Sequence, residues 1–502
     1  QKCEVIQTGS FIKGEELFCN FKSTHILYVN SSQIKWNVSI HNPSPASHAN
    51  GLWDLGDPGS IYLNNLCVSI ETEESSTFSI KPEEHDEWID NAQEITLFQE
   101  SSGGEQWKST NHINKDGDIP QKNKGYNGSI DKTNISGMRA SPTVQIVDGP
   151  VIALKNFWQN FPQRITCKNG TVNLEIFPLR PNSPYELQGG EKKTHSLLID
   201  FNSNKCNSIN KPLVVTISPS YIASTKALMH YSDGVEPIDT LINEGVVGSN
   251  SFIQKRELID EYGWRNFGDI FADHESLYLK DNSKYISHYN NQYDPLYGFI
   301  RQHLNTGNTA WLTMANELAQ HITDIDIYDT TEDRAEYNGG LFWHTDHYVD
   351  AYTSSHRTYS KHQVIDELPT QGGGPGAEHC YTYGLLLHHY ISGSLESKTA
   401  VLTLTKWITH FYEGTGTFIE QLLRTKKQLI PKIKSGLRTG KVLSHTYPLD
   451  RGVGNYICAL LDSFALTQDE QYIKNAERVI KQTVHPADDI ESRNLDNPET
   501  TD

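Results

Sequence analysis

The fold of the C-terminal half of the chain is decided by the stretch Leu296–Ile325, which reads L-Y-G-F-I-R-Q-H-L-N-T-G-N-T-A-W-L-T-M-A-N-E-L-A-Q-H-I-T-D-I. Its apolar residues recur at helical spacing on both sides of Gly307, and the second run passes through Trp311, Leu318 and Ile322. An apolar stripe with a period near 3.6 residues predicts an amphipathic helix, and a glycine between two such runs predicts a turn. The stretch therefore predicts an αα-hairpin.

The same pattern occurs twice more toward the C-terminus. Tyr383–Tyr412 is broken at Gly393, and Tyr456–Val484 is broken near Gln468. These breaks are too irregularly spaced for a strict solenoid repeat. Several αα-hairpins with long loops on one side indicate an α/α toroid whose loops line a central cleft. Because the polar tail His485–Asp502 contains no closing element, we expect a toroid that is incomplete or trimmed.

The N-terminal half shows the period of two that is typical of strands. In the stretch from Gln33 onward, Ile34, Trp36, Val38 and Ile40 fall on one face. Further short strands are expected at residues 61–63, 66–70, 172–178, 197–199 and 213–217. Many short strands separated by Gly and Pro turns favour a sandwich or a barrel.

These patterns predict a multidomain α+β chain. Residues 1–245 are expected to form a β-rich region of one or two sandwich-like or barrel-like domains, with a polar, aperiodic insert at about 101–142. Residues 246–502 are expected to form the α/α-hairpin toroid domain. The length of 502 residues is compatible with two to four domains.

The charge balance limits the classes of partner. With 43 basic and 62 acidic residues, the chain carries a formal charge of −19, which argues against a general nucleic-acid-binding protein with a basic face. An anionic small substrate stays compatible, because a few arginines in a cleft attract anions locally. No apolar run approaches the ~18–20 residues of a membrane span. The chain begins at Gln1 rather than Met, so we expect a processed or trimmed chain from which any signal peptide has been removed.

Cysteines and sequons favour an exported glycoprotein, either secreted or on the cell surface. None of the seven cysteines forms a C-x-x-C pair, which argues against a zinc ribbon. One or two disulfides are permitted among the five in the first 206 residues, Cys3, Cys19, Cys67, Cys167 and Cys206. The N-x-S/T sequons, which mark candidate glycosylation sites, occur at Asn30, Asn37, Asn127, Asn134 and Asn169.

A second informative stretch runs from Asn338 to Tyr359 and reads N-G-G-L-F-W-H-T-D-H-Y-V-D-A-Y-T-S-S-H-R-T-Y. It contains His344, His347 and His356, and imidazole is the side chain whose ordinary pKa lies closest to neutral pH. Histidines in such a segment can also simply cap helices or bind backbone carbonyls. We expect this stretch to converge at the mouth of the toroid with the loops at 262–275, 288–294 and 372–383.

Five stretches resemble a known family. They are F-W-Q-N-F-P (157–162), E-L-Q-G-G-E-K-K-T-H (186–195), Y-G-W-R-N-F-G-D (262–269), H-Y-N-N-Q-Y-D (288–294) and G-G-G-P-G-A-E-H (372–379). Together they resemble the exo-rhamnogalacturonan lyase-like family of polysaccharide lyases. The resemblance implies β-domains related to a RIFT barrel and a sandwich, followed by an α/α toroid. It implies an acidic glycan as substrate and leaves the sugar open.

A lyase that acts on a uronic acid needs three groups. One group neutralises the carboxylate, a base removes the adjacent C–H proton, and an acid protonates the leaving oxygen. His and Tyr suit the base and the acid, whereas Asn, Arg or a cation suits the carboxylate. We predict a catalytic set of His288, Tyr293, His344, His347 and His379. We predict that an acidic polysaccharide or oligosaccharide is bound by Arg265, Asn266, Asn290, Asn291, Arg357 and Tyr381.

Several alternatives stay open. A glycoside hydrolase needs two facing carboxylates, and the loops offer Asp269, Asp273, Glu275, Asp294, Asp346 and Glu378. The sequence indicates no definite cofactor, but a divalent metal could be held by His344, Asp346 and His347 with His274 or His379, although H-E-x-x-H is lacking. The chain could also be a non-catalytic, self-assembling surface or filament protein with an enzyme-like fold. Arg265 and Asp269 could form only a structural ion pair.

Overall fold

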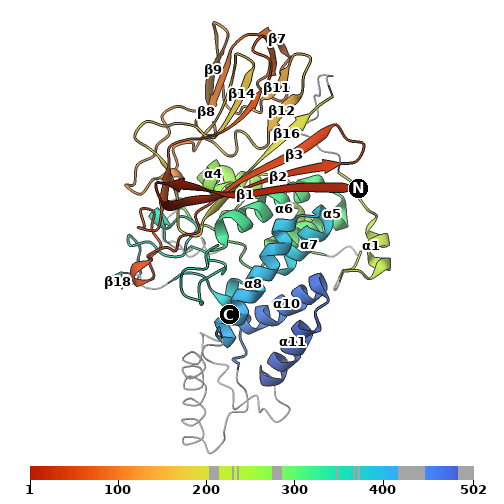
Figure 1. Ribbon diagram of the computed structural model, residues 1–502. Coiled ribbons are helices and arrows are strands. Elements are labelled where there is room, and N and C mark those ends of the chain that lie inside the picture. Colours follow the sequence, from red (N-terminus) through yellow and green to blue (C-terminus); the bar gives the residue numbers. More distant parts are fainter. Residues whose placement is uncertain are drawn as a thin grey trace, which may run out of the picture.

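The computed structural model divides the chain into a β-rich part and a helical part (Figure 1). It describes residues 1–202, 214–228, 231–233, 237–273, 285–345, 349–365, 368–369, 373–415 and 447–483. Strands β1 to β16 all precede residue 201, and every described α-helix follows residue 218. The coarse fold is therefore mixed α+β with an N-terminal β region, as the sequence predicts.

The first sheet has eight antiparallel strands in the spatial order β1-β2-β3-β16-β12-β11-β6-β7. Their bounds are β1 Lys2–Lys13, β2 Glu16–Tyr28, β3 Gln33–His41, β16 Lys192–Asp200, β12 Val151–Leu154, β11 Thr143–Ile146, β6 Phe78–Lys81 and β7 Ile89–Ala92. The third and the last strands of the β-rich part meet inside this sheet, because β3 pairs with β16 along its whole length.

The second sheet has six antiparallel strands in the order β10-β9-β8-β13-β14-β5. Their bounds are β10 Thr133–Gly137, β9 Tyr126–Ile130, β8 Ile95–Gln99, β13 Gln163–Lys168, β14 Thr171–Phe177 and β5 Leu66–Glu71, and β15 Tyr185–Leu187 pairs separately with β4 Ile61–Leu63. Both large sheets share one core, in which Phe78, Ile80 and Leu197 of the first sheet join Leu97 and Ile165 of the second. The two sheets thus pack face to face like a sandwich.

Most of the predicted strands are confirmed. β3, β4, β5 and β14 lie where period-two patterns predict them, and β16 extends the strand expected at 197–199. The strand expected at 213–217 is wrong over its described part, 214–217, where Val215 is 82% exposed and no strand pairs with the segment.

The polar insert expected at 101–142 is also corrected. It is an irregular loop only as far as residue 125, after which β9 and β10 add a hairpin to the edge of the second sheet. The stretch looks aperiodic because an edge strand with one face in solvent needs few apolar residues.

Three helix pairs are present in the described residues of the helical part, and they confirm the predicted αα-hairpins. The pairs are α5 Pro295–Thr306 with α6 Thr309–His321, α7 Tyr383–Ser392 with α8 Leu395–Glu413, and α10 Arg451–Thr467 with α11 Glu470–Thr483. The first two turn at Gly307 and Gly393, each with a φ of 68°, the left-handed conformation that favours glycine after a helix. The shorter helices are α1 Pro219–Thr225, α2 Asp239–Asn243, α3 Phe252–Ile259 and α4 Gly263–Asn266.

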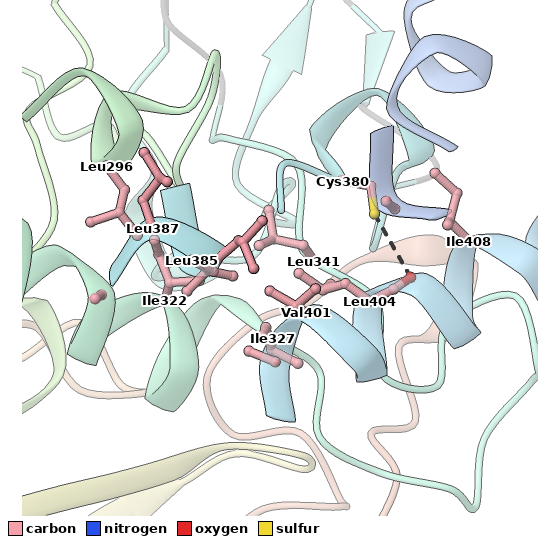
Figure 2. Packing of buried hydrophobic residues seen from close by; sticks show 14 of the residues in the cluster. Leu296, Ile322, Ile327, Leu341, Cys380, Leu385, Leu387, Val401, Leu404 and Ile408 are labelled. Atoms are coloured by element: carbon pink, nitrogen blue, oxygen red, sulfur yellow. Dashed lines mark hydrogen bonds between the residues drawn. The ribbon is translucent and has the colours of Figure 1, made fainter. Parts of the chain in front are cut away.

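The three hairpins share one apolar core. Figure 2 shows Leu385, Val401 and Leu404 beside Ile322 and Leu341, all of them fully or almost fully buried. The contacts join residues of α7 and α8 to the end of α6 and to the chain that follows it. Burying these aliphatic side chains is the main contribution that holds the hairpins together.

The two parts of the chain meet along β16. Thr194 is the third residue of this strand, and its backbone N–H and hydroxyl donate to Asp324 at 2.8 and 2.9 Å. Asp324 belongs to the π-helical turn η4, Ile322–Asp326, which continues α6. In Figure 1 the long strands β1, β2 and β3 run across the helical part beneath them. The eight-stranded sheet therefore packs against the helices as well as against the second sheet.

The structure shows the surroundings of most of the cysteines and sequon asparagines that suggest export. The six described cysteines, Cys3, Cys19, Cys67, Cys167, Cys380 and Cys458, are all free, so no disulfide joins them; Cys206 lies outside the described residues. Four of the sequon asparagines, Asn30, Asn127, Asn134 and Asn169, are exposed, whereas Asn37 lies in β3 and accepts a hydrogen bond from Ser196. In the part of the chain that the structure describes, no helix is both long and apolar enough to cross a membrane.

We predict that Leu404→Ala lowers the free energy of unfolding by about 2–5 kcal/mol, because it opens a cavity in the core shared by the hairpins. The matched control is Leu395→Ala on the same helix, which should cost less than about 1 kcal/mol because Leu395 is 43% exposed. Urea denaturation followed by circular dichroism measures both. Equal losses for the two variants would contradict this assignment of the core.

Candidate functional site

Aromatic and basic side chains from three loops and the start of α10 meet in what we call the outer cluster. The ring centroids of His344 and His379 are 5.1 Å apart, and those of His379 and Tyr381 are 6.3 Å apart. Tyr293 lies 6.5 Å from Tyr381, and the guanidinium carbon of Arg451 lies 5.1 Å from the Tyr293 ring centroid. The cluster is completed by Trp343, so its members are Tyr293, Trp343, His344, His379, Tyr381 and Arg451.

The outer cluster reaches solvent. Tyr293 is 60% exposed, whereas His379 is fully buried and the other members are half-buried. Burial raises the pKa of Tyr381 above its ordinary value, and the opposing effect of Arg451 does not cancel this. Tyr381 therefore keeps its phenolic proton at neutral pH.

The histidine on the solvent side has a defined tautomer. His344 Nδ1 lies 2.6 Å from the carbonyl oxygen of Thr345. A carbonyl oxygen can only accept, so Nδ1 must carry the proton in this contact. In the neutral ring the other nitrogen, Nε2, is then unprotonated and can act as a base.

The loop that carries Tyr293 has an unusual backbone. Left-handed φ values of 48°, 56°, 58° and 55° occur at Asn290, Asn291, Tyr293 and Asp294. Asn and Asp tolerate this conformation, but it is rare for a bulky residue such as Tyr293. Asp294 fixes the loop, because its carboxylate accepts from the backbone N–H of Tyr297 and of Gly384, at 3.2 and 2.9 Å. Such conformations persist where surrounding contacts enforce them, and they concentrate at functional sites.

A second group of side chains, which we call the inner cluster, is buried. It consists of Glu261, Asp269, His288, His321, Asp326 and His356, each of them no more than 1% exposed. His356 is central, because its Nδ1 lies 3.4 Å from Asp269 Oδ2 and 3.3 Å from His321 Nε2. His288 Nδ1 lies 3.1 Å from Glu261 Oε1. His321 Nε2 also lies 3.1 Å from Asp326 Oδ1.

Burial and neighbouring charges shift the pKa values of the inner cluster. Burial lowers the pKa of His356 well below its ordinary value, so this ring is neutral. Burial raises the pKa of Asp269 to about 7, with His321 opposing the rise and Asp326 adding to it. Burial alone would lower the pKa of His321, but the adjacent Asp326 carboxylate outweighs it and raises that pKa.

One loop joins the two clusters. The side-chain amide of Asn290 donates to the carbonyl oxygen of Trp343 at 2.8 Å and to that of His356 at 2.7 Å. The backbone N–H of His288 donates to Thr345 Oγ1 at 2.6 Å. A change in the inner cluster can therefore move residues of the outer cluster.

A pocket of about 180 Å³ lies between the β-rich part and α4. Its walls come from residues 111–116 and 182–186 on the β side and from residues 262–266 on the helical side. Asn266 separates it from the inner cluster, because its amide group donates to the Asn111 carbonyl at 2.9 Å and its oxygen lies 3.1 Å from His356 Nε2. The pocket is smaller than the ~300–1,000 Å³ of usual small-molecule sites.

The structure brings together only some of the residues predicted from sequence. Tyr293, His344, His379 and Tyr381 meet in the outer cluster, whereas His288 belongs to the inner one. Arg265 does not pair with Asp269; its Nε donates to Glu191 Oε1 at 2.7 Å. The guanidinium carbon of the buried Arg357 lies 4.9 Å from the ring centroid of Phe342. Outside the described residues lie Asp346, His347, His274 and Glu275.

The described carboxylates considered for a hydrolase have other partners or positions. Asp273 pairs with Lys255 at 2.9 Å, and Asp294 is the N-cap of α5. Asp269 belongs to the buried inner cluster, and Glu378 lies in η6, Ala377–His379. The residues that sequence reasoning missed are Trp343, Arg451, Glu261, His321 and Asp326. Arg451 could have been noticed, since a cation in the first turn of a helix opposes the helix dipole.

Comparisons with known proteins do not identify a family for this chain. No family model and no curated protein matches the chain. A TPR-domain containing protein from Parabacteroides distasonis aligns with 95% of this chain and 65% of its own, at 9% identity and a TM-score of 0.23. A TM-score this low does not establish a shared fold.

We predict that Arg265→Ala lowers the free energy of unfolding by about 3–5 kcal/mol, because it leaves the buried Glu191 carboxylate without its cation. Lys481→Ala removes an exposed pair with Glu477 and should cost less than about 0.5 kcal/mol. Guanidinium chloride titration measures both changes. A stable Arg265→Ala protein that has lost only glycan binding would instead restore Arg265 as a substrate-binding residue.

Proposed function

We propose that the protein is a polysaccharide lyase-like enzyme that cleaves a uronate-containing glycan by β-elimination. The observation that carries this proposal is the outer cluster, which combines a guanidinium group, two imidazoles and two phenols, one of them that of the exposed Tyr293. These are the three kinds of group that the reaction requires, with Arg451 taking the part of the cation. The described part of this cluster contains no facing pair of carboxylates, which a hydrolase would require.

The proposed step balances without water. Nε2 of His344 removes the proton from the carbon next to the uronate carboxylate. The electron pair left behind forms a C=C bond, and the C–O bond to the neighbouring sugar breaks. The phenol of Tyr293 gives its proton to the departing oxygen, and Tyr381 lies beside Tyr293.

The other residues of the cluster and its loops have supporting roles. Arg451 pairs with the carboxylate, so that negative charge developing next to it is stabilised. His379 packs between His344 and Tyr381 and sets their separation. Asn290 holds the Tyr293 loop against the chain that carries His344. His347, as a neighbour of His344 in sequence, stays a proposed member of the catalytic set.

We also propose the finer architecture that the family resemblance implies. The three αα-hairpins would be part of an α/α toroid, and the packed sheets would correspond to β-domains related to a RIFT barrel and a sandwich. The outer cluster lies where the loops between hairpins gather, as expected for the mouth of a toroid. Because the proposed substrate is an acidic glycan outside the cell, we propose that the protein is a glycoprotein that is secreted or bound to the cell surface.

We predict that His344→Gln and Tyr293→Phe each reduce turnover by ~10²–10⁴, because each removes one member of a positioned acid–base pair. The controls are His389→Gln and Tyr390→Phe at the end of α7, where His389 bonds the Ser394 carbonyl and Tyr390 is 50% exposed. Ultraviolet absorbance of the unsaturated uronate formed during digestion of acidic glycans measures turnover.

Saturated products from an active preparation would overturn the lyase proposal in favour of a hydrolase. No turnover with any acidic glycan, together with assembly that is unchanged in the same variants, would favour the non-catalytic surface or filament protein.

We predict that Arg451→Gln lowers kcat/KM by ~10²-fold or more on a free uronate, because it removes the cation that pairs with the carboxylate. On the methyl-esterified form of the same glycan, whose carboxyl group is uncharged, the loss should be much smaller. Steady-state kinetics on the two substrates separates these cases. Equal losses of kcat/KM on the two substrates would show that Arg451 does not recognise the carboxylate.

A further inference from the structure

Four side chains of the inner cluster converge from three separate segments of the chain. Glu261 and Asp269 flank α4, His288 precedes α5, and His356 follows η5, Tyr352–Ser354. One nitrogen or oxygen atom of each lies within 4.8 Å of those of all the others. Ligand atoms held ~2.0–2.2 Å from a tetrahedral ion are ~3.3–3.6 Å apart. The separations of 3.1 Å between His288 and Glu261 and 3.4 Å between His356 and Asp269 are near that spacing.

The negative charge of two buried carboxylates at this site requires a cation. Glu261 and Asp269 are both 0% exposed, and a buried carboxylate is costly unless it is paired. Asp269 Oδ1 is buried and has no hydrogen-bond partner in the described part of the chain. Two arginines of the same segment are paired elsewhere, Arg256 with Glu317 and Arg265 with Glu191.

We propose that Glu261, Asp269, His288 and His356 bind one divalent transition-metal ion. Two imidazoles and two carboxylates suit zinc, cobalt or manganese, whereas calcium and magnesium prefer oxygen ligands alone. With Nδ1 of His356 facing Asp269, the other ring nitrogen, Nε2, lies 3.1 Å from Asn266 Oδ1, and such outer partners orient the ligands of metal sites. This site differs from the one considered from sequence at residues 344–347.

The site is structural rather than catalytic. Its four ligands are no more than 1% exposed, and Asn266 stands between His356 and the pocket. An ion here would tie the loops before α5 and after η5 to the segment around α4. Because Asn290 joins the carbonyl groups of His356 and Trp343, the ion would also fix the position of the outer cluster.

The test uses the full chain, stripped of metal with a chelator and then incubated separately with Zn²⁺, Co²⁺, Mn²⁺ or Ca²⁺. Bound ions are counted by mass spectrometry after gel filtration. We expect about one equivalent of Zn²⁺, Co²⁺ or Mn²⁺ per chain and no retained Ca²⁺. Because an ion that binds only the folded state stabilises it, the Tm should rise by at least ~2 °C.

The variants Asp269→Asn and His356→Gln should retain less than about a tenth of the wild-type metal. The matched control is His388→Gln, because His388 is equally a buried histidine but bonds Ser397 and Asn316 in another place. Uptake of no ion by the stripped protein, with an unchanged Tm, would overturn the proposal, as would full occupancy in both variants. If a variant fails to fold, the test is the visible absorption spectrum of Co²⁺ bound to the wild-type chain. A spectrum that shows no nitrogen ligands would overturn the proposal.

Discussion

The structure depends on pairing the buried carboxylates that follow α3. Asp260 accepts hydrogen bonds from Ser102 at 2.6 Å and from His112 at 2.7 Å, both in the β-rich part. Glu261 accepts from the amide of Asn111 at 2.8 Å, also from the β-rich part. Because an unpaired buried charge costs several kcal/mol, these contacts fix the irregular loops of the β-rich part against the helices.

The same segment organises the helical loops. Asp269 accepts from the backbone N–H of Tyr289 at 3.0 Å, and Asn266 faces His356. These contacts hold two loops in left-handed conformations that Tyr293 and His356 would avoid in a free peptide. The strain is offset by burial and by hydrogen bonds in the inner cluster. As a result the polar groups of the outer cluster are supported by a rigid interior rather than by flexible loops.

The period-two strands and the helical hairpins are local patterns, and the structure contains both. Local periodicity predicts β3, β4, β5 and β14 and all three αα-hairpins, because each pattern reports which face of one element is buried. The edge hairpin β9–β10 is missed, because one face in solvent leaves little apolar pattern. Of the candidate residues chosen by chemistry alone, Tyr293 and His344 belong to one cluster, at opposite ends of a series of ring contacts through Tyr381 and His379, whereas Arg265 pairs with Glu191.

The sequence by itself thus determined the order of β and α elements, the hairpin turns at glycine and the kinds of side chain that could perform proton transfer. Only the tertiary structure decided which of them meet. His288, His321 and His356 lie far apart in the chain, and Arg451 comes more than 150 residues after Tyr293. Short-range periodicity carries no information about such pairings. They follow from how helices pack and from the requirement that buried charges find partners, which no single segment can satisfy alone.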